Sequence, residues 1–217
     1  MDKKVLDQQS QHWEKSFSSK PEMFGLEPSL PAKKSLEIFK KNNIKSILEL
    51  GAGLGRDTIY FAQNSIRVHA LDYSKSAVEN INKKSKKLGL EEFIETKIFD
   101  VRETFKFDDN IFDGCYSHML YCMALTDDDI KNLNKEIHRI IKPNGINIYT
   151  VRNTLDGDYK KGIHRGEDLY EMNGFIINYF SEQKIKDNLE GFNNLSTENF
   201  EEGNFPRRLY YVVNQKK

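Results

Sequence analysis

The segment ELGAGLGRD at residues 49–57 has the composition of a ligand-binding turn. Its glycines, in a G-x-G-x-G pattern, lie between a short apolar run at residues 46–50 and a helical pattern at residues 55–64. Glycine allows a tight backbone turn and lets a ligand approach the main chain. Free amide groups at the start of a helix favour a polar or anionic group on that ligand. We therefore predict a ligand site at this turn.

Asp72 narrows the chemistry of the ligand. It ends the next apolar run, 21 residues after Gly51, where a carboxylate can accept hydrogen bonds from both hydroxyls of a ribose. The dinucleotide fingerprint G-x-G-x-x-G would require glycine at position 56, which is Arg56 here. A large side chain is unfavourable where a helix packs close under a pyrophosphate. The ligand is thus expected to contain a ribose, and a nicotinamide-dependent oxidoreductase is the less favoured alternative.

The elements that position these residues alternate regularly from residue 32 onward. Strand patterns separated by helical patterns of about 10–15 residues indicate βαβ units and a parallel sheet. We predict one α/β domain at residues 32–217, with a Rossmann-like, doubly wound, seven-stranded sheet that is mostly parallel and ends in an antiparallel hairpin. The expected helices are 32–41, 55–64, 74–88, 126–141 and 181–189, and the expected strands are 46–50, 66–71, 93–99, 111–117, 146–151, 192–200 and 208–213, with Gly203, Asn204 and Pro206 between the last two.

Four motifs together resemble those of the class I S-adenosylmethionine-dependent methyltransferases. They are LELGAGLGRD at 48–57, Asp72 within ALDYS, the pair Asp100-Val101 after the third strand, and KPNG at 142–145 before the fifth. The closing hairpin is also typical of that fold. The Gly-Arg-Asp sequence after the glycines is similar to a small-molecule branch that includes tellurite-resistance-type and thiopurine-type enzymes.

The resemblance implies S-adenosyl-L-methionine as cofactor, S-adenosyl-L-homocysteine as product, and a role for each matching residue. The glycine turn would line the methionine part, with Glu49 near its amine, while Asp72 would hold the ribose hydroxyls. Tyr73, Asp100 and Val101 would contact the adenine, and the end of the fourth strand, including Met119, would lie beside the sulfonium. The expected cofactor-binding residues are Glu49, Gly51, Ala52, Gly53, Arg56, Asp57, Asp72, Tyr73, Ser74, Asp100, Val101, Ser117 and His118.

The acceptor is expected to be a small molecule. Methyltransferases acting on base or amide nitrogens often carry Asn/Asp-Pro-Pro-Tyr after the fourth strand, and this chain has SHML at 117–120. Cys122 follows Tyr121 rather than a proline, which disfavours carbon-5 cytosine chemistry. The chain carries 33 Lys and Arg against 33 Asp and Glu, without the basic excess usual for phosphate-backbone binding. We therefore expect no nucleic-acid partner.

Methyl transfer from a sulfonium is an in-line displacement, so the enzyme mainly aligns donor and acceptor. A base is needed only if the acceptor is protonated, and His118 is the best candidate by position, with Tyr121 as a second catalytic candidate. Residues 152–178 are interpreted as a substrate-side insertion, with a solvated loop as the alternative. Arg152, His164 and Arg165 would suit an anionic acceptor, and Glu167 would suit an amine or pair with the arginines.

The remaining expectations concern the chain ends and the cellular context. Residues 1–31 carry Trp13, Phe17 and Phe24 and are interpreted either as a lid over the cofactor or as packing on the flank. No apolar run approaches the ~20 residues of a membrane span, and no secretory signal is seen. Two cysteines without close metal-ligand spacing predict no metal site and a cytoplasmic protein. A non-catalytic S-adenosylmethionine-binding protein stays open as an alternative.

Overall fold

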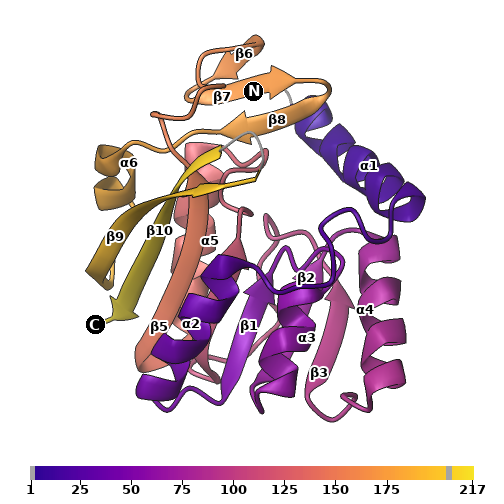
Figure 1. The fold of residues 1–217 in the computed structure, drawn as a ribbon. Coiled ribbons are helices and arrows are strands. Elements are labelled where there is room, and N and C mark those ends of the chain that lie inside the picture. The colour runs from indigo at the N-terminus through magenta and orange to yellow at the C-terminus, as the bar shows by residue number, and fades with distance from the viewer. Residues whose placement is uncertain (1–2, 204–206) are drawn as a thin grey trace.

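The computed structural model describes residues 3–203 and 207–217 and is built around one seven-stranded sheet (Figure 1). Its strand order is β3-β2-β1-β4-β5-β10-β9. The first five strands in this order pair in parallel, and β10 pairs antiparallel with both β5 and β9. The predicted fold class is confirmed. The strands are β1 Ser46–Leu50, β2 Arg67–Asp72, β3 Ile94–Ile98, β4 Phe112–His118, β5 Ile141–Arg152, β9 Phe192–Glu202 and β10 Arg207–Lys216.

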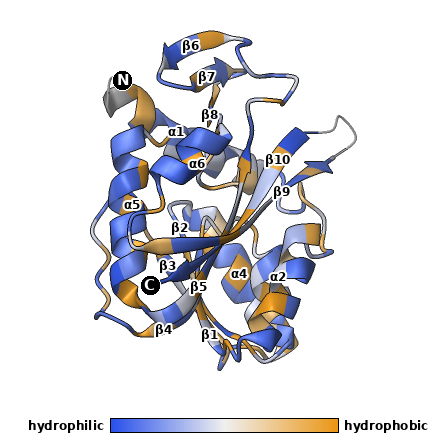
Figure 2. Cartoon of the chain, turned by 90° about the vertical axis from the view of Figure 1, so that its left-hand side faces the viewer, coloured by the Kyte–Doolittle hydropathy of each residue, from blue (hydrophilic) through white to orange (hydrophobic). Residues whose placement is uncertain are grey.

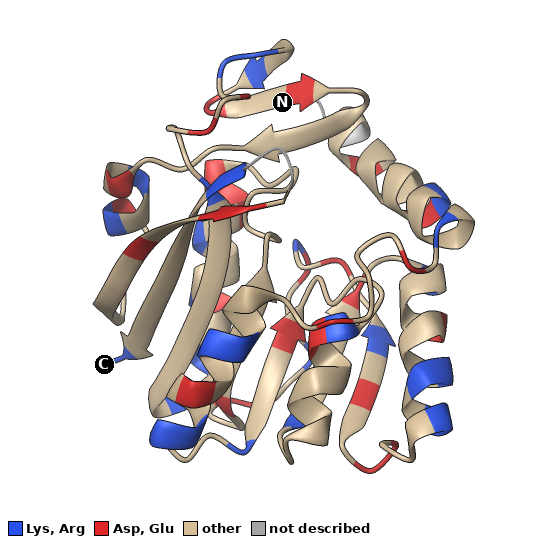
Figure 3. Ribbon diagram, viewed as in Figure 1, with Lys and Arg blue, Asp and Glu red and all other residues tan. Residues whose placement is uncertain are grey.

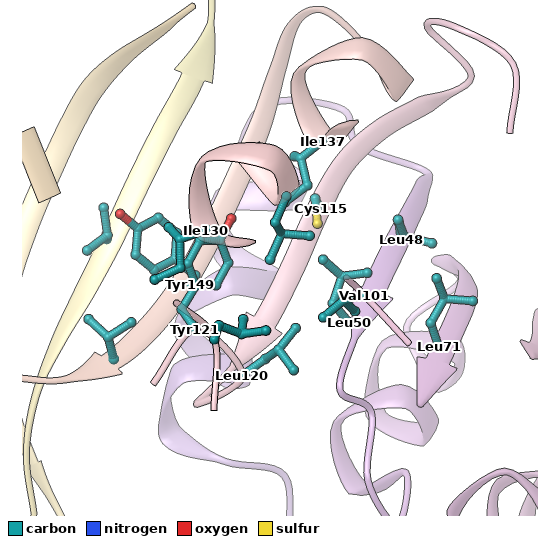
Figure 4. Packing of buried hydrophobic residues seen from close by; sticks show 14 of the residues in the cluster. Leu48, Leu50, Leu71, Val101, Cys115, Leu120, Tyr121, Ile130, Ile137 and Tyr149 are labelled. Atoms are coloured by element: carbon teal, nitrogen blue, oxygen red, sulfur yellow. The ribbon is translucent and has the colours of Figure 1, made fainter. Parts of the chain in front are cut away.

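Helices cover both faces of the sheet because its strands are apolar on both sides. Leu48 and Leu50 of β1 pack toward α5, whereas Ile47 packs in a second cluster with α2, α3 and α4. Figure 4 shows part of the first cluster, and Figure 2 shows the apolar positions along the elements. The helices are α2 Leu30–Lys41, α3 Arg56–Gln63, α4 Lys75–Leu88, α5 Asp127–Ile140 and α6 Glu182–Asp187.

The starts of α4 and α5 are fixed by N-cap side chains. Ser74 accepts a hydrogen bond from the backbone of Ala77, and Thr126 forms a reciprocal capping box with Asp129. Both helices therefore begin within one residue of the starts expected at 74 and 126. Because α4 begins directly after Asp72, its cap also holds the chain at the carboxyl end of β2.

Two segments differ from the sequence-based expectation. Residues 152–178 are not irregular throughout, because they contain a separate antiparallel sheet of β6 Ile163–Gly166, β7 Leu169–Met172 and β8 Phe175–Asn178. Four-residue strands are too short to show a clear alternation of apolar and polar residues. The N-terminal segment forms a 17-residue helix, α1 Lys3–Ser19, which ends before Pro21. Its inward-facing positions include polar Gln9, which weakens the helical pattern.

Several smaller expectations concern the surface and the hairpin. Among the described residues, no helix is long and apolar enough to cross a membrane, and no cluster could hold a metal ion. Cys115 and Cys122 are free and buried. Figure 3 shows acidic and basic residues interspersed along the elements. The hairpin of β9 and β10 is present, while its expected turn residues Asn204 and Pro206 lie outside the described residues.

Candidate functional site

A cavity of about 490 Å³ lies at the carboxyl ends of the parallel strands. This is where ligands bind in open α/β sheets, and the volume is in the range of small-molecule sites. The helix α1 and the small sheet β6-β7-β8 lie above this end of the main sheet (Figure 1). The cavity thus has a floor made by the main sheet and a cover made by the two segments that the sequence patterns describe least well.

The glycine turn forms one wall of the cavity. Gly51 and Ala52 donate backbone hydrogen bonds to the carbonyl of Leu71, at 2.8 and 3.1 Å, which ties the turn to the end of β2. Gly55 has φ +80°, and a Cβ there would meet Ile81 at 2.5 Å, so only glycine lets α3 pack this closely on α4. A Cβ on Gly53 would meet only Phe17, at 3.7 Å. Phe17 of the N-terminal segment therefore lies in van der Waals contact over this glycine.

Glu49 places an unusual carboxylate against this wall. Its side chain is buried, lines the cavity, and its Oε2 has no hydrogen-bond partner within the described part of the chain. Burial, reinforced by the nearby charge of Asp57, raises the pKa of Glu49 well above its usual value. An unsatisfied buried carboxylate is costly unless a ligand supplies a donor. The arrangement suits an amine or ammonium group.

Asp72 stands opposite the glycine turn. Its Oδ2 accepts the amide hydrogen of Gly53 and its Oδ1 that of Ser74, each at 2.8 Å. Burial raises the pKa of Asp72 to about 6, although these two hydrogen bonds counteract the increase. A carboxylate oxygen can accept more than one hydrogen bond. Both oxygens therefore keep the capacity to accept hydrogen bonds from a pair of ligand hydroxyls.

Of the residues expected near the adenine, some line the cavity and others lie outside it. Tyr73 and Val101 line the cavity, and burial raises the pKa of the Tyr73 hydroxyl, which keeps it neutral. Asp100 is not among the lining residues, and its carboxylate accepts hydrogen bonds from the Arg102 guanidinium at 2.6 to 3.1 Å. Ser74 is also outside the lining, because its hydroxyl caps α4 and donates to Glu14 of α1.

Arg56 and Asp57 both line the cavity at the start of α3. Asp57 is already engaged, since it accepts hydrogen bonds from the backbone and hydroxyl of Ser29 and from the hydroxyl of Tyr116. Arg56 donates to the carbonyl of Phe24 and lies 3.7 Å from a carboxylate oxygen of Glu202. Asp57 therefore anchors the entry to α2, whereas Arg56 joins three segments around the cavity mouth.

The end of β4 places His118 and Met119 on the cavity wall. His118 Nδ1 lies 2.8 Å from the Thr150 hydroxyl oxygen, and its Nε2 lies 3.3 Å from Glu202 Oε2. Ser117, one residue earlier, is fully buried and does not line the cavity. Its hydroxyl has no hydrogen-bond partner within the described residues.

Tyr121, the second catalytic candidate, lies in the core rather than at the cavity. Its ring stacks on Tyr149 with 4.2 Å between the ring centroids (Figure 4). Its hydroxyl donates to Asn134 Oδ1 at 2.7 Å. The side chain is 1% exposed. After Met119 the chain turns, which directs this side chain toward α5 instead of the cavity.

Of the four acceptor-side candidates, the structure brings only Arg152 to the cavity wall. Arg152 is buried and forms ion pairs with Asp156 and Asp158. The three others lie on β6 and its turn, outside the lining residues. His164 is bonded to the backbone of Glu167, Arg165 pairs with Glu171, and Glu167 accepts from the backbone of Asp127.

The rest of the acceptor side comes from residues without a sequence motif. The N-terminal aromatics do reach the cavity, and the rings of Trp13 and Phe175, both in its wall, pack against each other with 4.9 Å between their centroids. The spacing of Trp13 and Phe17, four residues apart on α1, is the one sequence signal that could have predicted their position at the cavity. The lining residues absent from the expected site are Met23, Gly25, Leu54, Phe99, Leu120, Met123, Asp158, Met172, Asn173, Phe175, Ile177, Tyr179, Glu202 and Arg207.

Comparison with known protein families gives the turn and cavity a context. The family described as a methyltransferase domain matches residues 47–145, from β1 to the start of β5. These residues form a methyltransferase domain. The match includes Glu49, the glycine turn and Asp72, which line the cavity. The methyltransferase expected from the sequence is confirmed. A search of curated proteins finds no match to the chain.

Solved structures extend the similarity beyond the methyltransferase domain. An S-adenosylmethionine-dependent methyltransferase from Methanosarcina mazei has a TM-score of 0.71 at 18% identity, over 82% of this chain and 96% of that one. TehB from Haemophilus influenzae gives 0.67 at 17% identity, over 85% and 62%. A Burkholderia thailandensis 1,6-didemethyltoxoflavin N1-methyltransferase, crystallised with its substrate and S-adenosylhomocysteine, gives 0.65 at 18%, over 87% and 79%. These likenesses show the fold.

The residues of this methyltransferase domain fit S-adenosylmethionine. Glu49 offers an unsatisfied oxygen to an amine, and Asp72 offers two acceptors to a pair of hydroxyls. Gly53 lines the same cavity and carries no side chain that would fill it. The donor and acceptor types therefore match the amine and the ribose of that molecule.

Proposed function

We propose that this protein transfers a methyl group from S-adenosylmethionine to a small-molecule acceptor with a flat, apolar body. The observation that carries the proposal is one continuous cavity whose two halves differ in chemistry. The cofactor half is bounded by the carboxylates and the glycine turn, and the acceptor half by methionine and aromatic side chains. His118 and Met119 lie at the end of β4, between the halves.

In the cofactor half, the chain's own groups have separable tasks. Glu49 accepts from the cofactor amine, Asp72 holds the ribose hydroxyls, and Tyr73 and Val101 cover the adenine. The bound cofactor supplies a methyl group on a positively charged sulfur, which is a good leaving group. The protein then accelerates the displacement by holding the acceptor in line with that methyl group.

The acceptor half supports a small, apolar and polarizable substrate. Three methionine side chains line it, and methionine adapts to irregular shapes and contacts aromatic rings favourably. Arg152, the cation expected to bind an anionic acceptor, is already neutralised by two aspartates. A nucleic-acid strand would have to enter beneath α1 and the small sheet, so an enclosed small molecule fits better. The apolar lining on this side is Met119, Leu120, Met123, Met172, Phe175, Ile177 and Tyr179.

Residues 1–31 act in this proposal as the cofactor lid, and residues 152–178 as the acceptor-side wall. The lid role is supported by Trp13, Phe17 and Phe24, which line the cavity from α1 and the following turn. Phe17 also lies over Gly53, 3.7 Å from where a Cβ on that residue would be. A lid that excludes water protects the reacting groups and strengthens the polar contacts beneath it.

The test is turnover with S-adenosylmethionine and a panel of small aromatic amines, phenols and thiols. We expect S-adenosylhomocysteine to form with at least one acceptor and a methylated product to appear by mass spectrometry. Asp72→Asn should weaken cofactor binding, whereas the exposed Asp108→Asn should not. Tight binding of S-adenosylmethionine without methyl transfer to any acceptor would instead favour a non-catalytic binding protein.

A further inference from the structure

Both ring nitrogens of His118 already have a protein partner. Nδ1 lies 2.8 Å from Thr150 Oγ1, and Nε2 lies 3.3 Å from Glu202 Oε2. Thr150 Oγ1 already accepts the backbone amide hydrogen of Met119 at 2.9 Å. Because the Glu202 carboxylate can only accept, the neutral ring facing it carries its hydrogen on Nε2, and Nδ1 then accepts the threonine hydroxyl hydrogen.

This arrangement leaves His118 without a lone pair for the acceptor. A neutral imidazole has one acceptor nitrogen, and here Thr150 occupies it. A protonated imidazole has none. In either state His118 holds its two neighbours and would have to break one of those contacts before it could take a proton.

Glu202, at the end of β9, is the group that His118 orients. Its side chain is 21% exposed and lines the cavity, and its second oxygen lies 3.7 Å from Arg56 Nη2, beyond normal hydrogen-bond length. Burial acts to raise the pKa of Glu202, but the hydrogen bond and charge of His118, with Arg56 nearby, outweigh burial and lower it. An ionised carboxylate with acceptor capacity to spare thus faces the acceptor half.

We propose that Glu202 contacts the methyl acceptor directly, that His118 is its positioning residue, and that the acceptor is a neutral, flat molecule carrying an N–H group. This inference rests on the proposed function. A carboxylate disfavours an anionic acceptor, and Arg152 is too fully paired to compensate. A phenol would have to give its proton to a weak base, whereas a neutral amine needs no prior deprotonation.

Methyl transfer to such a nitrogen can be completed with Glu202 and water alone. The nitrogen lone pair forms the new bond to the methyl carbon, and the carbon–sulfur bond breaks with its electron pair left on sulfur. Positive charge moves to the nitrogen, where the Glu202 carboxylate stabilises it as it develops. The nitrogen proton then passes to Glu202 and on to water, which regenerates the carboxylate.

The test uses two ligands, indoline and N-methylindoline, which share a flat bicyclic body and differ in the N–H group. Binding is measured in the S-adenosylhomocysteine complex of the full chain, by NMR titration of the Trp13 indole N–H. The chain has one tryptophan and it lines the cavity, so this resonance reports on the site. Glu202→Gln is compared with Glu201→Gln, because Glu201 is the exposed neighbour that pairs with Arg208.

We expect the wild type and Glu201→Gln to bind indoline about tenfold more tightly than N-methylindoline, and Glu202→Gln to lose most of that preference. A steric penalty from the extra methyl group would persist in Glu202→Gln. Comparing the two ligands in the wild type and in Glu202→Gln therefore isolates the contact between Glu202 and the N–H group. Equal affinity for both ligands in the wild type, or an undiminished preference in Glu202→Gln, would overturn the inference. Failure of S-adenosylhomocysteine itself to shift the Trp13 resonance would instead count against the proposed function.

Discussion

Asp72 combines a structural and a ligand-binding position in one side chain. It closes the glycine turn through Gly53 and starts α4 through Ser74. Burial raises its pKa to about 6, so its charge changes just below neutral pH. Hydrogen bonds from ribose hydroxyls favour the ionised form, and binding should therefore lower this pKa. The residue links cofactor affinity to pH.

We predict that affinity for S-adenosylhomocysteine falls as the pH drops below about 6 and that binding at this pH releases protons. Asp72→Asn should weaken binding by about tenfold or more and remove the part of the proton release that Asp72 supplies, while Glu49, whose pKa is also raised by burial, keeps its own part. Calorimetry in buffers of different ionisation enthalpy measures both effects. An affinity that is flat from about pH 5 to pH 8 would contradict the role given to Asp72.

Tyr121 is expected to stabilise the fold rather than to take part in catalysis. Its hydroxyl donates to Asn134 in the core, away from the cavity. Tyr121→Phe should lower the free energy of unfolding by about 1–2 kcal/mol and the melting temperature by roughly 2–8 °C. Cofactor affinity and turnover should stay unchanged. A large loss of turnover in a variant that binds the cofactor normally would restore Tyr121 as a catalytic candidate.

At the scale of elements, α1 joins the two halves of the site. Glu14 accepts hydrogen bonds from Ser74 and Ser76 at the start of α4. Gln9 makes two bonds to β8, accepting from the Ile176 amide and donating to the Gly174 carbonyl. The helix therefore rests on a cofactor-side element and on an acceptor-side strand at once.

We predict that Gln9→Ala loosens α1 from β8 and speeds the release of S-adenosylhomocysteine by about tenfold, since one buried and one partly buried hydrogen bond are lost. Gln11→Ala, an exposed change on the same helix, should leave the release rate unaltered. Stopped-flow displacement followed by Trp13 fluorescence gives both rates. Equal rates in the two variants would show that α1 does not act as a lid.

The sequence predicted the elements with strong local signals. Repeated apolar runs and capping residues such as Thr126 mark the central sheet and its helices. The helix α1 and the small sheet escaped prediction because their stability comes from tertiary contacts, such as Gln9 with β8, rather than from a local apolar pattern. Tertiary packing overrides weak local preference in such segments.

At the scale of the whole molecule, the two halves of the site differ in how the chain builds them. Most of the cofactor half comes from residues 49–57 and 72–73, so its motifs could be recognised locally. The acceptor half combines β8 and the end of β9, with α1 resting over both halves, and Glu202 meets His118 only because the hairpin returns beside β5. No spacing along the sequence indicates that meeting.

The fold itself does not determine the reaction. Function is decided by the site rather than by the sheet that supports it. The identity of the ligand that enters the glycine turn is therefore the central claim.

The most direct test is a thermal titration of the purified chain with S-adenosylmethionine, S-adenosylhomocysteine and NAD. A ligand at about 100 times its Kd stabilises the folded state by ~2.7 kcal/mol, which for this chain length raises the melting temperature by roughly 5–10 °C. We predict this shift with the two sulfur compounds, its loss in Asp72→Asn, and no shift with NAD. A shift with NAD, or no shift with either sulfur compound, would contradict the cofactor assignment.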